Sequence, residues 1–285
     1  MTSGKTEGRT GRTRGRTTRA LLLAGLVIGS AAVGLVSYYG RGYSDAMDDA
    51  RSLSRRASIE IAAGRSPEDL GPGRAAMVLE VQDPAFLVHE GSDYAGSGGG
   101  RTTVTQSLAA RMAFEQFRPG VAELRRSGYA RGLEAGLDKR RILTLWLDSV
   151  DMGRGPEGWL RGIFAASQAI YGKPPAQLSD REFLRLVAVA TAPGAFQLME
   201  PDPALDERVA RIERLLAGHC RPQGREDVTL DGCAKAPELG STGLKIQNRS
   251  LLVLLEQTRY MLPCDVDLSG HPGSEGEVTW LHSSS

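Results

Sequence analysis

The sequence predicts a mainly α-helical domain behind a single N-terminal transmembrane helix. Three observations lead to this fold class: an uncharged apolar run near the N-terminus, apolar residues that recur at helical spacing, and helix-start and helix-stop residues around those segments. The 285 residues suffice for one substantial domain with appendages. The sequence contains no Rossmann glycine fingerprint, no alternation of strands with helices and no internal repeat, which argues against an α/β fold.

The N-terminal segment is predicted to anchor the chain in a membrane. Residues 1–19 are basic and otherwise rich in Thr, Gly and Ser, so we expect a disordered cytoplasmic arm. Residues 20–40 carry no charge, and their number matches the roughly 20 residues that a helix needs to cross a bilayer. The basic arm should stay in the cytoplasm, which places the C-terminal domain outside it. A cleaved signal peptide is the alternative, but its apolar region is usually shorter, and no clear small-x-small cleavage site follows.

Overall charge and cysteine usage narrow the class further. The formal net charge is +1, so nothing indicates binding to nucleic acid. The three cysteines, Cys220, Cys233 and Cys264, fit an oxidising compartment. Cys220 and Cys233 would close a short loop as a reasonable disulfide, although a bridge from Cys264 to either of them stays open. Because Cys-x-x-Cys spacing is absent, the cysteines make a poor zinc site, and no metal ligands are predicted.

Residues 41–74, directly after the anchor, are predicted to hold a juxtamembrane helix and a linker. The helix should run from Tyr43 to Ala63, with Ser44 as its N-cap. The turn Gly71-Pro72-Gly73 then interrupts the chain. Further on, residues 93–100 are almost entirely Gly and Ser, and we expect them to be mobile.

The remaining helices are predicted from apolar periodicity and from capping residues. Ser179 begins a capping box and Asp202 precedes a proline, so each marks a helix start. A turn is expected at Gly153-Arg154-Gly155-Pro156. The predicted helices cover residues 103–118, 121–149, 159–171, 180–192 and 203–217, and another, 245–262, lies in a Cys-containing extension over 219–264 that precedes a flexible tail at 265–285.

The most specific pattern in the chain lies between residues 82 and 106. It reads Gln82-Asp83-Pro84-Ala85-Phe86-Leu87-Val88-His89-Glu90-Gly91-Ser92-Asp93, then Gly100-Arg101-Thr102-Thr103-Val104-Thr105-Gln106. This pattern resembles the signature of the peptidoglycan glycosyltransferases (glycosyltransferase family 51), which polymerise lipid II. In that family the run is Glu-Asp-x-x-Phe-x-x-His-x-Gly-x-Asp, followed by Gly-Gly-Ser-Thr-Ile-Thr-Gln-Gln.

Further matches extend the resemblance over about Met77 to Leu216. They lie, in the family's order, at residues 139–148, 153–158, 165–166, 171–173 and 178–193. The resemblance implies a lysozyme-like glycosyltransferase domain over residues 75–218, in a protein of the bacterial cytoplasmic membrane. The implied partners are lipid II or the nascent glycan strand, the membrane, and proteins of the cell-wall synthesis machinery. The family also leaves a divalent cation open as a cofactor.

One letter of the signature departs from the family. Gln82 stands where the family has the glutamate that acts as general base on the acceptor sugar. A carboxamide is essentially nonbasic in water, and general-base assistance is typically worth about 10²–10⁴-fold in rate. The nearest alternative carboxylates are those of Glu90 and Glu80, and Glu80 is the candidate considered as a substitute base. It would share a face with Gln82 in an extended chain and point away from it in a helix.

The family's second catalytic glutamate has two candidate positions. An alignment without gaps places Arg126 there, whereas a gapped alignment makes Glu134 the second acid. The gapped version needs an insertion and a compensating deletion of about two helical turns, so the ungapped version is preferred. The resemblance implies substrate binding for the following residues: Asp83, His89, Thr103, Gln106 and Arg126.

Several of these residues also have purely structural explanations. Asp83 and His89 could pair and fix their loop, and Thr103 and Gln106 could cap the helix that they begin. Donor-site positions have changed as well, because Ser107 replaces the family's second Gln and Ala110 replaces its Lys. The arginines Arg101, Arg111, Arg118, Arg125, Arg126 and Arg131 keep the region basic, either for anion binding or as a solvated face near lipid head groups.

Two functions follow from these residues. One is a lipid II-polymerising enzyme that uses Glu134 and a substitute base. The other is a non-catalytic member that binds lipid II, nascent glycan or a cell-wall synthesis partner. Hydrolysis of the lysozyme type also needs a well-placed carboxylic acid and has no better support. Because the changed base coincides with changed donor-site positions, the sequence favours the non-catalytic function.

Overall fold

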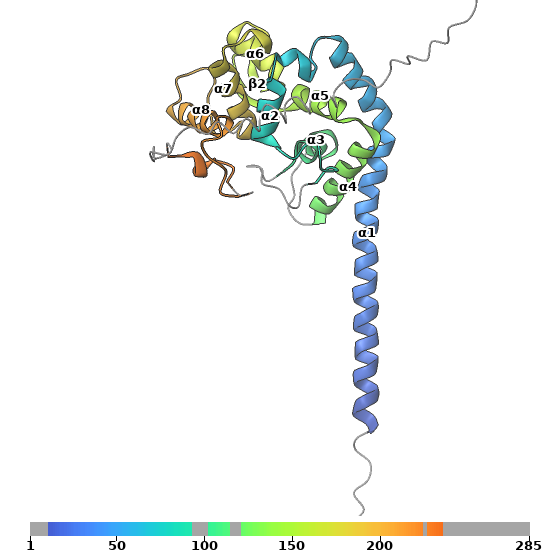
Figure 1. The fold of residues 1–285 in the computed structure, drawn as a ribbon. Coiled ribbons are helices and arrows are strands. Elements are labelled where there is room, and N and C mark those ends of the chain that lie inside the picture. Colours follow the sequence, from blue (N-terminus) through green and yellow to red (C-terminus); the bar gives the residue numbers. More distant parts are fainter. Residues whose placement is uncertain (1–10, 93–101, 115–120, 225–226, 236–285) are drawn as a thin grey trace, which may run out of the picture. The chain divides into compact units, whose positions relative to one another are not determined.

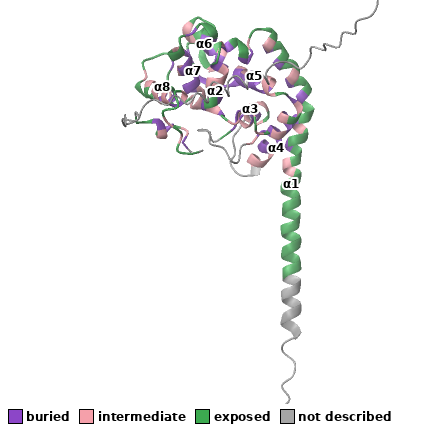
Figure 2. Ribbon diagram, in the orientation of Figure 1, coloured by how far each residue is buried: buried purple, intermediate pink, exposed green. Residues whose placement is uncertain are grey.

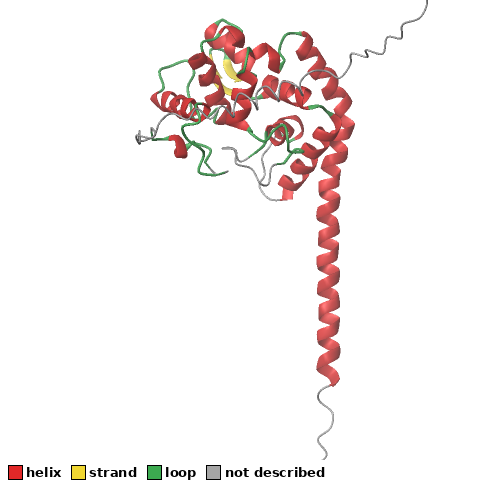
Figure 3. Ribbon diagram, viewed as in Figure 1, coloured by secondary structure: helices red, strands yellow, loops and turns green. Residues whose placement is uncertain are grey.

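The structure is a computed structural model that describes residues 11–92, 102–114, 121–224 and 227–235. Several expected features lie outside the described residues: the first ten residues of the arm, most of the Gly- and Ser-rich stretch, the helix predicted over 245–262, and the tail. Figures 1 and 3 show that the described part is almost entirely helical, with one short hairpin. The predicted mainly α fold is therefore confirmed.

One long helix, α1 (Gly11–Ala62), replaces the separate anchor and juxtamembrane helices that the sequence suggested. Ser44 lies inside this helix and caps nothing, and residues 11–19 are helical although we expected them to be disordered. Helix propagation is far easier than nucleation, so an established apolar helix extends readily into flanking residues. Within the described residues, α1 is also the one helix long and apolar enough to cross a membrane. Its residues 21–36 are exposed (Figure 2).

The C-terminal half of α1 packs closely against α4 (Val121–Gly136), beside which it lies in Figure 1. A Cβ atom on Gly42 would lie 2.1 Å from the Arg125 carbonyl oxygen, and one on Gly128 would lie 2.1 Å from the Tyr39 carbonyl oxygen. A Cβ atom on Gly132 would meet Ala46 at 2.6 Å. Only glycine allows backbones to approach this closely. These glycines therefore keep Gly40-Arg41-Gly42 in a continuous helix instead of breaking it.

Two polar contacts reinforce the α1–α4 interface. The Arg125 guanidinium bonds the Asp45 carboxylate at 2.5 Å, and the buried Tyr129 hydroxyl donates to Asp49 at 2.7 Å. Burial and this bond raise the pKa of the Tyr129 hydroxyl. Contacts advance in the same direction along both helices, which shows that α1 and α4 run parallel.

The other elements form the body of the domain around a single apolar core (Figure 2). Trp146, Tyr129, Phe86 and Phe183 are its largest fully buried side chains. In chain order the elements are η1 (Pro67–Leu70), α2 (Arg74–Gln82), α3 (Val104–Ala113), α4, α5 (Lys139–Ser149), β1 (Asp151–Gly155), β2 (Gly158–Arg161), α6 (Ile163–Tyr171), η2 (Pro175–Gln177), α7 (Asp180–Thr191), α8 (Pro203–Leu216) and η3 (Asp231–Cys233).

Three of the predicted helices were wrong in extent, and the first of them, 103–118, ends already at Ala113, with Phe114 as its C-cap. The segment 121–149 is two helices, because Asp138 starts α5 anew by accepting the Arg141 amide at 2.8 Å. Trp159 lies in strand β2 and not in a helix, because the chain forms an antiparallel β1–β2 hairpin here. Gly153, Arg154 and Gly155, which were predicted as a turn, lie in strand β1, and the tip of the hairpin is at Pro156 and Glu157. The helix predicted there begins only at Ile163.

The predicted helix starts at Ser179 and Asp202 are confirmed. Ser179 and Glu182 form the capping box of α7. The Asp202 carboxylate accepts the backbone amides of Ala204, Leu205 and Gln197. These bonds, that from Gln197 foremost, lower the pKa of Asp202.

A disulfide joins Cys220 and Cys233, one of the three pairings that the sequence allowed. Arg214 on α8 holds the loop closed by this disulfide, because its Nε donates to the Cys233 carbonyl at 2.7 Å. Cys264 lies outside the described residues.

Candidate functional site

Gln82 is the last residue of α2, and its side chain is turned toward α7. Its amide nitrogen donates to the Val187 carbonyl oxygen at 3.2 Å. A carboxylate has no hydrogen to donate, so a glutamate in this orientation would face the carbonyl without a bond. The contact with Val187 thus depends on the amide hydrogens, which glutamine has and ionised glutamate lacks.

Asp83 and His89 fix the loop that follows α2, as their structural explanation predicts. The Asp83 carboxylate accepts from His89 Nε2 at 2.8 Å and from the first amide of α3, that of Val104, at 2.9 Å. His89 Nδ1 accepts the Gly91 amide at 3.1 Å, so the ring's hydrogen is on Nε2. Both side chains are almost fully buried. This arrangement orients the imidazole and uses both of its nitrogens.

Glu134 and Lys139 form a second part of the same polar network. The buried Glu134 carboxylate bonds Lys139 Nζ at 2.7 Å and the Thr105 hydroxyl at 2.6 Å. Lys139 also donates to the His89 carbonyl at 2.8 Å and lies 4.6 Å from the centre of the Phe86 ring. Glu134 Oε1 is 3.9 Å from His89 Nδ1. The contacts of the Glu134 carboxylate therefore connect α4 with α3 and α5, and through Lys139 with the loop after α2.

Thr103 and Gln106 cap α3, which was the structural alternative for them. Thr103 Oγ1 accepts the Gln106 amide at 3.0 Å and donates to the Gly91 carbonyl at 2.8 Å. Gln106 returns a bond to the Thr103 amide and donates to Ser92 at 3.1 Å. Gly91 itself has a φ of 95°, and a Cβ there would meet the backbone of Ala130 at 2.9 Å. The loop consequently lies tight against α4.

Arg126 lies about two turns before Glu134 on α4. Its side chain is only 10% exposed, and it donates to the Glu123 carboxylate at 2.5 Å. The helix runs through both positions without interruption. Arg126 and Glu134, the two candidates for the position of the family's second acid, therefore lie on one continuous helix.

The substitute base considered for the site is poorly placed. Glu80 belongs to the helical α2, so its side chain points away from that of Gln82. Desolvation raises the pKa of Glu80. The position of Glu80 on the helix nevertheless separates its carboxylate from the side chain of Gln82. Glu80 therefore lacks the geometry of a replacement.

A half-buried arginine on α3, Arg111, is the other charged group of note. Arg111 donates to Ser107 at 2.9 Å and to Ser149 at 3.3 Å, and it lies 5.9 Å from the centre of the Trp146 ring. Burial lowers its pKa to about 10, while the charge of Asp151 opposes that shift. Ser107, one of the changed donor-site positions, thus binds the arginine.

The described residues do not fit a divalent cation. They contain no group of three or more His, Cys, Asp or Glu side chains that could hold a metal ion. The two buried carboxylates of the network, Asp83 and Glu134, already have nitrogen and hydroxyl partners. No step of chemistry at this site is therefore assigned to a metal.

Every candidate residue that the sequence suggested lies in the described part of the chain. The sequence reasoning did not identify Lys139, which bonds both Glu134 and His89. A signal was available, because Lys139 begins a helix five residues after Glu134 and belongs to the matched segment 139–148. Asp83, His89, Thr103, Gln106 and Glu134 are joined in one network. Gln82 adjoins it through the chain, and Arg126 lies apart from Glu134 on α4.

Comparison with known proteins decides the family. Residues 66–217 match the family described as transglycosylase. The chain belongs to the transglycosylase family. A biosynthetic peptidoglycan transglycosylase of Rhodospirillum centenum is 30% identical over 160 residues, which cover 52% of this chain and 68% of the relative. That of Xanthomonas campestris pv. campestris is 26% identical over 162 residues, 53% of this chain and 64% of the relative.

Membership in this family means that the chain has a lysozyme-like domain and is transglycosylase-like. A third relative, the biosynthetic peptidoglycan transglycosylase of Escherichia coli, is 27% identical over 162 residues. The chain spans 64% of the length of the Xanthomonas relative, so the transglycosylase match concerns the domain and not the complete relative. The apolar N-terminal part of α1 fits a membrane anchor for such a domain.

Proposed function

We propose that this transglycosylase-family protein binds lipid II or the nascent glycan strand during cell-wall assembly and does not polymerise it. In the proposed topology α1 crosses the bacterial cytoplasmic membrane once and the domain lies outside the cytoplasm, where lipid II is used. The basic residues before the apolar part of α1 support this orientation.

The Gln82 contact carries the proposal. The bond from the Gln82 amide to Val187 gives the carboxamide a structural partner that a carboxylate would lose. Arg126, at the second acid position in the ungapped alignment, adds a cation where the reaction needs an acid. Glu134, the alternative second acid, is buried and bonded to Lys139. Without a free carboxylate at either position, proton removal from the acceptor hydroxyl lacks its base.

Substrate binding does not need that base. The loop geometry set by Asp83 and His89 is present, and Arg111 and Arg126 are the cations that would bind a pyrophosphate, in exchange for their present partners Ser107 and Glu123. Charge-assisted bonds from arginine to phosphate are among the strongest hydrogen bonds in proteins. A protein of this kind can hold lipid II or glycan for a neighbouring synthase.

A lipid II polymerisation assay with the full-length protein tests the proposal. We expect no glycan chains from the wild type, together with measurable lipid II binding in the same preparation. The double variant Gln82→Glu, Arg126→Glu restores both acids and should polymerise if the remainder of the site is intact. Gln177→Glu, an added acid at an exposed position on η2, is the matched control. Formation of glycan chains by the wild type would refute the non-catalytic function. Absence of lipid II binding would refute lipid II as the ligand.

A further inference from the structure

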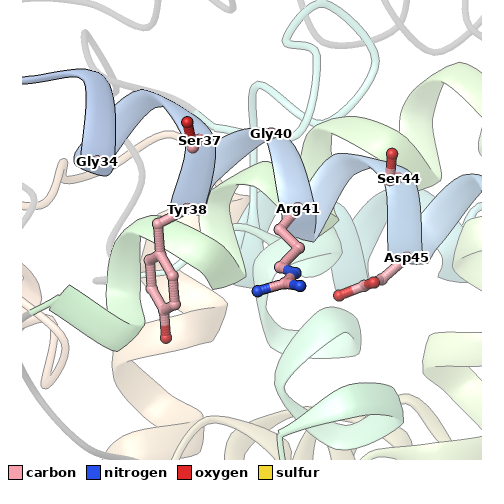
Figure 4. A pocket seen from close by; sticks show the side chains of 7 residues that line it. All are labelled: Gly34, Ser37, Tyr38, Gly40, Arg41, Ser44 and Asp45. Carbon is pink, nitrogen blue, oxygen red and sulfur yellow. The ribbon is translucent and has the colours of Figure 1, made fainter.

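A pocket of about 560 Å³ lies along one helix, on the part of α1 that follows its apolar stretch. Figure 4 shows Tyr38, Arg41 and Asp45 projecting toward one side and Ser37 and Ser44 toward the other. Gly34 and Gly40 complete the lining in the described part of the chain, and a Cβ atom on either would meet nothing within 4 Å. The pocket is therefore polar at its walls and open between them.

The electrostatics of the pocket favour an anion. Asp45 is neutralised by Arg125 of α4, at 2.5 Å. Arg41 is exposed and forms no ion pair with any carboxylate of the described residues. One positive charge thus remains on this surface. The hydroxyls of Ser37 and Ser44 lie on the opposite side of the helix from Arg41 (Figure 4), so Arg41 is the cationic donor on its side of the pocket.

The depth of the pocket in a bilayer follows from its place in the sequence. The uncharged run ends at Gly40, and the pocket extends from Gly34 to Asp45. Residues at the end of a membrane-spanning run lie at the level of the lipid head groups, where tyrosine and arginine are favoured. Phosphate is the abundant anion at that level.

We propose that this pocket binds the phosphate of an anionic phospholipid from the leaflet next to the domain, with Arg41 as its main ligand. Guanidinium matches a phosphate with two parallel hydrogen bonds. The glycines Gly34 and Gly40 leave room for the glycerol part of the lipid. The residues that line the pocket all belong to α1. The pocket is therefore separate from the candidate site, whose network includes Asp83, His89 and Glu134. The inference depends on α1 crossing a membrane and not on whether the protein polymerises lipid II.

Lipid retention by the full-length protein tests this site. The protein is reconstituted with equal phosphatidylglycerol and phosphatidylcholine, stripped by detergent exchange, and the lipid that remains is counted by mass spectrometry. We expect the wild type to retain phosphatidylglycerol preferentially. Arg41→Gln should retain about tenfold less, because it loses one charge-assisted hydrogen-bonded contact with the phosphate. The control Arg55→Gln removes another exposed arginine from the same face, about 21 Å further along α1, and should retain as much as the wild type.

Three outcomes would overturn the proposal. The first is a wild type without preference for phosphatidylglycerol, and the second is unchanged retention in Arg41→Gln. The third comes from an arm with added lipid II: if Arg41 is needed for lipid II and not for phosphatidylglycerol, the ligand is the pyrophosphate lipid. Should Arg41→Gln misfold, Arg41→Lys and the salt dependence of wild-type retention take its place, because a charge-held phosphate is lost at high ionic strength.

Discussion

At the scale of single residues, Lys139 has the largest structural role in the candidate site. It bonds the side chain of Glu134 and the backbone of His89 and covers the face of Phe86. One cation thus connects the start of α5, the end of α4 and the loop after α2. A network of this kind holds a loop in a single conformation because each member satisfies another.

Lys139→Met should therefore destabilise the protein strongly. The substitution leaves the buried Glu134 carboxylate without its cation, and we expect a loss of about 2–4 kcal/mol in the free energy of unfolding. Urea unfolding of the detergent-solubilised protein measures it. Arg181→Gln is the control, since the Arg181–Asp206 pair is exposed on both sides and should contribute about 1 kcal/mol or less. Equal losses in the two variants would contradict the structural role of Lys139.

Asp202 should make stability depend on pH in the acid range. Its backbone bonds lower its pKa below the ordinary value of 3.8. The stabilisation is therefore present above that value and is lost as the pH falls through the lowered pKa. Asp202→Ala should cost about 1 kcal/mol at pH 7, and the difference from the wild type should shrink toward pH 3. Asp202→Asn keeps a capping oxygen without the charge, so its stability should lack this pH dependence.

At the scale of elements, the α1–α4 interface depends on glycines at four-residue spacing. Gly128, Gly132 and Gly136 bring the α4 backbone against α1, where Ala46 and Ala50 are the opposing small side chains. This parallel pair joins a predicted membrane helix to a water-exposed domain along residues 39–50 of α1.

Gly128→Ala should weaken this interface. Its new methyl group would lie 2.1 Å from the Tyr39 carbonyl oxygen, so the helices must separate. We expect a loss of about 1–3 kcal/mol despite the higher helix propensity of alanine. Gly40→Ala adds the same methyl group to open space on α1 and should be neutral or slightly stabilising. Thermal unfolding of both variants checks the pair, and an unaffected Gly128→Ala would show that the interface is loose.

The elements also show what the sequence could and could not predict. Capping at Ser179 and Asp202 is local chemistry, and it was predicted correctly. Continuity of α1 past Gly42 depends on contact with α4, which no local pattern contains. The β1–β2 hairpin was predicted only as a turn at Gly153-Arg154-Gly155-Pro156, because its strands are too short to show alternation.

The same division applies to the site. The pairing of Asp83 with His89 and the capping by Thr103 and Gln106 involve neighbours in sequence, so residue chemistry predicted them. The bond between Gln82 and Val187 joins α2 to α7 and required the folded structure. Whether the site has catalytic activity stays a prediction.

At the scale of the whole molecule, α1 belongs to the domain and not only to the anchor. Its residues Ala46, Ala50, Leu53 and Ala57 are buried, and Arg56 bonds Asp148 of α5 at 2.7 Å. The folded unit therefore extends N-terminally beyond the segment 75–218 that the family resemblance suggested, and beyond the matched residues 66–217.

Truncation should reveal this boundary. A fragment of residues 38–285 keeps the α1 half of the interface, including Tyr39, and should unfold cooperatively. A fragment of residues 64–285 exposes the apolar surface that α1 covers and should aggregate or lose its sharp transition. Circular dichroism during heating compares the two. Equal melting temperatures would show that α1 contributes nothing to the fold.

The parallel α1–α4 contact gives the domain no hinge with which to absorb a change in helix tilt. Helices longer than the local bilayer thickness respond by tilting, and a domain packed along such a helix must rotate with it. Val88 is 83% exposed and lies in the loop after α2. The distance from a spin label at Val88 to the lipid head groups should differ between bilayers of different acyl-chain length. A constant distance would mean that the contact yields. Under the proposed function, the thickness of the surrounding membrane would set the angle at which the site meets lipid II.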